Sequence, residues 1–124
     1  MKRPARRFVI REQTFGLHVE FYAGTPQAAA LRRCAKVMEM EANDPENAPD
    51  EAACAWALCS GNWACVWLED VTDAGSLVHE LYHVTQDFLK HIEASDEETG
   101  AYLLQYLFRE AQSRLTKKPK TQTK

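Results

Sequence analysis

The spacing of the apolar residues changes along the 124 residues of this chain, and this change limits the folds that the chain can adopt. Residues 8–23 have an extended character, and within them apolar and polar side chains alternate from 17 to 23, the period of a half-buried strand. From about residue 74 the apolar residues recur every three or four positions, the period of an amphipathic helix. Separate strand and helix segments of this kind predict an α+β domain with a small, mostly antiparallel sheet.

A β-hairpin is predicted between residues 52 and 68. Gly61-Asn62 suits its two-residue turn, because small residues tolerate positive φ. With this turn Trp56 faces Trp67 across the two strands, a strong cross-strand contact. The tryptophans are then part of the core, although a strand bordering a substrate cleft would let one of them line a subsite.

Helices are predicted at 28–40, at 74–92 and from about 95 to 115. Ser95 and Glu98 have the spacing of a capping box at the start of the last helix. Apolar residues that this pattern makes available for the core include Val37, Val78 and Ala101.

The length favours one domain, expected to span residues 8–115. A basic, flexible N-terminus at 1–7 and a disordered basic tail at 116–124 flank it. Between these arms lie 7 basic and 18 acidic residues, a formal charge of −11, which disfavours a nucleic-acid partner. No apolar run approaches the ~18 residues that a membrane span needs. A cytoplasmic protein is the expectation.

The four cysteines at 34, 54, 59 and 65 include no C-x-x-C pair. A four-cysteine zinc site is therefore not predicted, and the thiols are expected to be reduced, half-buried small side chains.

An H-E-x-x-H motif lies inside the predicted helix 74–92, with histidines at 79 and 83. Residues four apart share one face of a helix, so His79 and His83 can bind one metal ion. Glu80 follows the first histidine and can take a proton from a water bound on that ion. The motif predicts a zinc site with Glu80 as general base; the alternative is two histidines packing on an ordinary helix face.

A catalytic zinc ion usually has three protein ligands, so one more is needed. His91 lies eight residues past His83, about 12 Å along a continuous helix, and is too far away. A turn near 94–95 would bring the start of the last helix beside the histidines. Glu98 is the preferred third ligand, and Glu97 is the alternative.

These residues resemble a known class. The motif at 79–83, followed after fourteen residues by Glu98-x-x-Ala101, looks like the gluzincin metallopeptidases. More narrowly, Trp63–Leu68, Ser76–Glu80 and Glu98–Tyr102 resemble small metallopeptidases encoded by tailed bacteriophages and prophages. The resemblance implies a zincin-like fold, in which the active-site helix lies beneath a small sheet and the next helix carries a glutamate ligand.

In such a site Zn²⁺ on His79, His83 and Glu98 activates a water, Glu80 accepts its proton, and a peptide bond is hydrolysed. Tyr102, one turn after Glu98, is a candidate donor to the oxyanion, or else a packed side chain at the rim. Asp87, one turn past His83, either orients that histidine or faces solvent.

The leading hypothesis is thus a zinc metallopeptidase acting on a protein or peptide substrate in a phage-related process, in the host bacterial cytoplasm. The alternative is a non-catalytic protein in which zinc stabilises a small binding or virion-assembly domain that contacts a phage or host protein.

Overall fold

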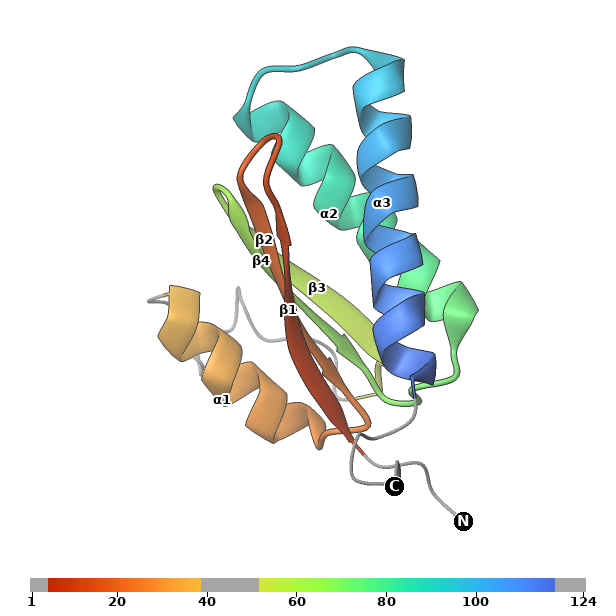
Figure 1. The fold of residues 1–124 in the computed structure, drawn as a ribbon. Coiled ribbons are helices and arrows are strands. Elements are labelled where there is room, and N and C mark those ends of the chain that lie inside the picture. Colours follow the sequence, from red (N-terminus) through yellow and green to blue (C-terminus); the bar gives the residue numbers. More distant parts are fainter. Residues whose placement is uncertain (1–4, 39–51, 118–124) are drawn as a thin grey trace.

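The computed structural model describes residues 5–38 and 52–117, which form four strands and three helices (Figure 1). The elements are β1 (Arg6–Glu12), β2 (Leu17–Ala23), α1 (Gln27–Met38), β3 (Ala55–Ser60), β4 (Trp63–Leu68), α2 (Ala74–His91) and α3 (Glu97–Thr116). Most of the predicted basic arms and the end of the helix predicted to reach residue 40 lie outside the described residues.

The four strands form one mixed sheet in the order β1-β2-β4-β3. Both hairpins, β1 with β2 and β3 with β4, are antiparallel, whereas β2 and β4 are parallel neighbours at the centre. The predicted α+β class with a mostly antiparallel sheet is confirmed. The parallel pairing was not predicted, because it joins strands separated by α1 and β3.

The register of the β3–β4 hairpin is as predicted, with Trp56 opposite Trp67 and their ring centroids 5.8 Å apart. The two side chains are only 6% and 3% exposed and pack in one cluster with Cys34 of α1. The interpretation of these tryptophans as core is confirmed. They face α1 and not α2, so they do not line a subsite beside the H-E-x-x-H motif.

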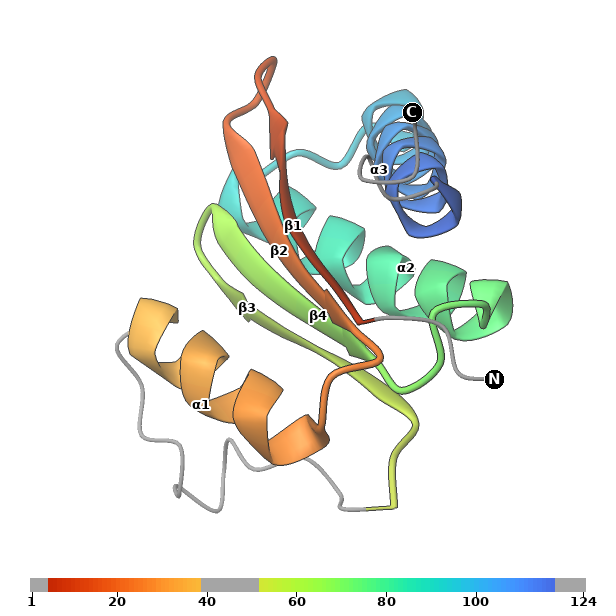
Figure 2. The ribbon, with the colours of Figure 1, turned by 60° about the horizontal axis from the view of Figure 1, so that its bottom comes forward.

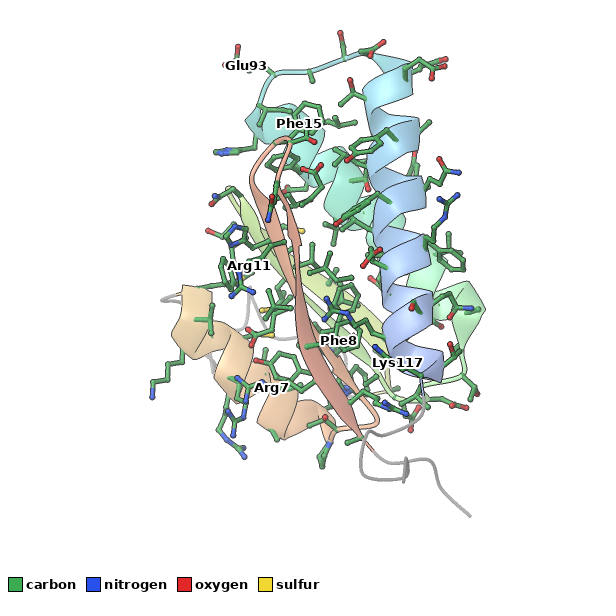
Figure 3. The ribbon with its side chains drawn as sticks, viewed as in Figure 1. Arg7, Phe8, Arg11, Phe15, Glu93 and Lys117 are labelled. Carbon is green, nitrogen blue, oxygen red and sulfur yellow. The ribbon has the colours of Figure 1, made fainter. Side chains whose placement is uncertain are left out.

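Helices cover both faces of the sheet (Figures 1 and 2): α1 lies on one face, and α2 and α3 lie side by side on the other. Alternate residues of the central strands supply the two cores. Val19 and Phe21 belong to the cluster under α2 and α3, while Tyr22 belongs to the cluster under α1. Figure 3 shows the same alternation at the start of β1, where Arg7 and Phe8 point to opposite sides.

The N-terminal boundary predicted at residue 8 is two residues late, because Arg6 and Arg7 belong to β1 and pair with Ala23 and Tyr22. The Arg7 guanidinium lies 3.3 Å from the Glu20 carboxylate and 5.4 Å from the centre of the Tyr22 ring. These contacts place two of the basic residues in the sheet instead of in a flexible arm.

Aspartates cap both long helices. Asp73 precedes α2 and accepts a hydrogen bond from the Ser76 amide at 3.0 Å. Asp96 precedes α3 and accepts one from the Thr99 amide at 3.1 Å. The predicted Ser95–Glu98 capping box is therefore wrong: with Asp96 as cap, the third helical position is Thr99, so Glu98 lies one position too early to complete a box.

We expect Asp73→Ala to lower the free energy of unfolding by about 1 kcal/mol at neutral pH, the usual effect of losing an N-cap. The bonds from Ser76 hold the pKa of Asp73 below its usual value of 3.8. A depressed folded-state pKa means that the stabilisation is complete above that value and is lost as the pH falls through the folded-state pKa. Urea unfolding of wild type, Asp73→Ala and the cap-preserving control Asp73→Asn at pH 7 and pH 2.5 tests this. A wild-type advantage over Asp73→Ala that persists unchanged at pH 2.5 would contradict it.

Candidate metal centre

The packing of α2 determines where its histidines point. Its buried stripe includes Leu77, Leu81 and Val84, which are at most 1% exposed and lie in the core beneath α2 and α3. At 100° per residue, positions 79 and 83 fall on the opposite side of the helix from this stripe. His79 and His83 are accordingly exposed.

The two imidazoles meet as the motif predicts. Their Nε2 atoms are 3.2 Å apart, and the rings are nearly perpendicular, at 78°. In this arrangement one neutral ring can donate a hydrogen bond to the other. It also fits a metal ion, because two nitrogens bound to tetrahedral zinc at 2.0–2.1 Å are about 3.3 Å apart. The pair therefore has the spacing of two zinc ligands.

Glu80 lies at the side of α2 that faces β3, and it is only 8% exposed. Burial raises the pKa of its carboxyl, and the neighbouring His79 and His83 oppose that shift. The same environment includes Cys59 of β3, whose pKa is raised to about 12, mainly by burial and also by the charges of Asp87 and Glu80. The carboxylate of the motif is thus largely buried and lies within electrostatic range of both the histidine pair and Cys59 of the outer strand.

Glu98 is not brought to the histidines. The helices α2 and α3 run antiparallel (Figure 1), and Gly100 packs so closely on Leu89 that a Cβ there would lie 3.1 Å from the leucine Cδ1. From that contact His83 is about 9 Å away along α2, and Glu98 is about 3 Å away in the opposite direction. A separation of about 12 Å exceeds the reach of a glutamate side chain.

Glu97, the alternative ligand, faces α2 but not the histidines. It lines a cavity of about 510 Å³ between the two helices, together with Gln86 and Lys90. Tyr82 also lines this cavity, and its ring centroid is 6.2 Å from that of His83, but neither histidine of the pair is among the lining residues. In the described parts of the chain, no third histidine, cysteine or acid joins the pair in a group able to hold a metal.

Tyr102 is placed away from the pair. Its hydroxyl donates a 2.7 Å hydrogen bond to Glu12 of β1, a carboxylate that is only 1% exposed. Glu12 also accepts from the amides of Thr14 and Phe15, and Figure 3 shows Phe15 at the tip of the β1–β2 hairpin. In this structure the Tyr102 hydroxyl connects α3 to the β1–β2 hairpin and is not directed at the histidine pair.

His91 and Asp87 are two further titratable residues of α2. The His91 ring packs beside the β3–β4 turn, where a Cβ on Gly61 would lie 3.6 Å from its Cε1. This position is separate from the pair, as the spacing predicts. Asp87 is exposed, and its charge acts on Cys59.

Sequence reasoning missed the positions of Glu12 beside Tyr102 and of Cys59 near Glu80, although signals for both exist. The alternation that turns Phe8 and Ile10 toward the core also places Glu12 on the inner face of β1. The hairpin register places Cys59 on the same face of β3 as Ala55 and Ala57, which pack against the core beneath α2. Both signals need the strand boundaries to be known first.

Comparison with protein-family models, with curated proteins and with solved structures finds no match to this chain. No helix in residues 5–38 or 52–117 combines the length and the apolar character that crossing a membrane requires.

We expect Tyr102→Phe to lower the melting temperature, because the buried Glu12 carboxylate loses a hydrogen-bond donor. Zinc affinity should be unchanged. Tyr106→Phe is the matched control, since Tyr106 stacks on Tyr102 with ring centroids 6.0 Å apart and the substitution keeps that stack. Thermal unfolding and a zinc titration measure both effects. A Tyr102→Phe protein that melts like wild type but binds zinc more weakly would place Tyr102 at the metal instead.

Proposed function

We propose that this protein is a zinc-dependent peptidase in which His79 and His83 hold the metal and Glu80 is the general base. The observation that carries the proposal is the 3.2 Å separation of the two Nε2 atoms, on a helix whose intervening position supplies a largely buried carboxylate. Zinc binding by the histidines alone does not require Glu80. The presence of this acid beside them therefore favours hydrolysis over a purely structural role of the ion.

When bound, zinc would act as a Lewis acid that lowers the pKa of a bound water and polarises the carbonyl group of the substrate. Glu80 would take the proton of the attacking water and return it to the amine that leaves as the C–N bond breaks. The burial of Glu80 limits the motion of its side chain, and its charge acts on Cys59 of β3. Positioning of this kind shortens the path of the proton.

The outer strand of the sheet favours a peptide as substrate. β3 is an edge strand, and edge strands offer backbone groups to an extended chain. Cys59 on β3 is close enough to Glu80 for the two groups to influence each other electrostatically. An extended peptide paired with β3 would therefore pass beside the proposed base. The resemblance to phage peptidases points to a protein substrate in a phage-related process.

A second candidate is a non-catalytic protein that zinc stabilises for a binding or virion-assembly role. One observation favours it: no third ligand joins the histidines within the described residues. Two histidines leave a zinc ion with positions that a partner can fill.

We expect His79→Ala and His83→Ala each to abolish measurable zinc binding, because a single imidazole cannot hold the ion. His91→Ala is the matched control, a histidine of the same helix outside the pair, and should bind zinc like wild type. Metal content after dialysis against a zinc buffer, on protein made without a histidine tag, measures the effect. Equal zinc in all four proteins, or none in wild type, would reject both candidate functions.

Glu80→Gln separates the two candidates. It should retain zinc but lower the rate of cleavage of a mixed peptide library by roughly 10²–10⁴-fold, the usual contribution of a general base. Cleavage is followed by mass spectrometry at low protein concentration. Zinc-loaded wild type that cleaves nothing, or that cleaves as fast as Glu80→Gln, would leave the binding role as the function.

A further inference from the structure

The outward face of α2 carries half of a metal site. His79 and His83 are both exposed and lie on the side of the helix opposite its core-facing stripe. Closed zinc sites in proteins have four ligands in a tetrahedron, and this pair supplies two of them. The α3 residues that line the cavity with Tyr82 include Ala101 and Leu104, which offer no ligand, and Glu97. Within the described residues, no acid of α3 joins the histidines in a group able to hold a metal.

Exposed apolar residues flank the pair on one side. Val78 is 40% exposed and Tyr82 is 52% exposed, although helical spacing made Val78 available for the core. Each lies one position before a histidine, so the two side chains form an apolar strip that runs beside the histidine pair along the helix. The rest of the exposed face has one acid, Asp87, and one base, Lys90, so two copies of it would meet without a net like charge.

We propose that zinc joins two copies of this chain through α2, with His79 and His83 of each copy as its four ligands. A two-fold axis through the ion makes the two pairs equivalent, and dimers with such symmetry are the commonest oligomers. If the two helices run antiparallel across the axis, the strip of Val78 and Tyr82 lies against the same strip of the second copy. The second copy thus completes the ligand shell and covers the apolar side chains.

This inference rests on the zinc-binding part of the proposed function and adds regulation to it. Four imidazoles leave no position for water or substrate, so the dimer would be inactive and hydrolysis would belong to the monomer. Glu80 would also lie beneath the helix of the second copy. Activity per chain should then fall as protein concentration rises in the presence of zinc.

Sedimentation equilibrium with added zinc, and again with a chelator, tests the proposal on the full chain. We expect a zinc-dependent dimer with one zinc ion per two chains, which returns to monomer when the metal is removed.

Three variants test the roles of the ligands and of the apolar strip. His83→Ala should stay monomeric in zinc. Tyr82→Glu keeps all ligands but places two like charges across the axis; it should stay monomeric and bind up to one zinc per chain, more weakly. Val37→Glu is the matched control, because Val37 is 43% exposed on α1, on the other face of the sheet; it should dimerise like wild type.

Each alternative result has a definite meaning. Zinc bound at one ion per chain with a monomeric mass at every concentration would overturn the dimer and leave the proposed function in place. A dimer that persists in chelator, or one that His83→Ala still forms with zinc, would also overturn it. Wild type that binds no zinc would reject this proposal and the proposed function together.

Discussion

The burial of one stripe of α2 against the sheet is the contact on which the rest of the site depends. Leu77, Leu81 and Phe88 are almost completely buried in the larger core, which also contains residues of β2, β4 and α3. Because exposing these side chains to water would be costly, the burial fixes the orientation of α2 about its own axis. That rotation places Glu80 at the boundary with β3 and turns His79 and His83 outward.

Close packing of α2 and α3 has a second consequence. Gly100 allows the start of α3 to approach Leu89, near the end of α2. The acids of the first turn of α3 are therefore level with the end of α2, while the histidine pair lies near its middle. A gluzincin-like site in one chain needs a glutamate level with that pair. Counted from the contact of Gly100 with Leu89, the stretch of α3 level with the pair is 106–110. Glu110 lies in that stretch, but within the described residues it does not join the histidines in a group able to hold a metal. The proposed site is therefore open: the described residues supply the histidine pair and the adjacent Glu80 but no third ligand, and we propose that a second molecule completes it.

Much of the local structure could be predicted because it depends on neighbours in sequence. The β3–β4 register follows from a short turn, which leaves one way to pair Trp56 with Trp67. The capping of α3 shows the limit of this reasoning. Ser95 and Asp96 are adjacent and can both cap a helix, and choosing the wrong one displaces the predicted helix start. The burial of Glu12 and the position of Cys59 near Glu80 were not predicted, because they depend on which face of a strand α2 and α3 cover.

By itself, the sequence determined that two histidines and a glutamate share one helix, since a spacing of four residues brings the imidazoles together in any α-helix. It also determined the α+β class through the two periods of its apolar residues. Only the tertiary structure decided that β2 and β4 pair in parallel, that Tyr102 binds Glu12, and that Glu98 lies far from the pair. Those outcomes depend on how helices and strands distant in sequence pack, because a helix can slide or rotate against its neighbour without changing its own pattern. The proposed metal site thus combines a histidine pair set by local geometry with an exposed setting determined by packing.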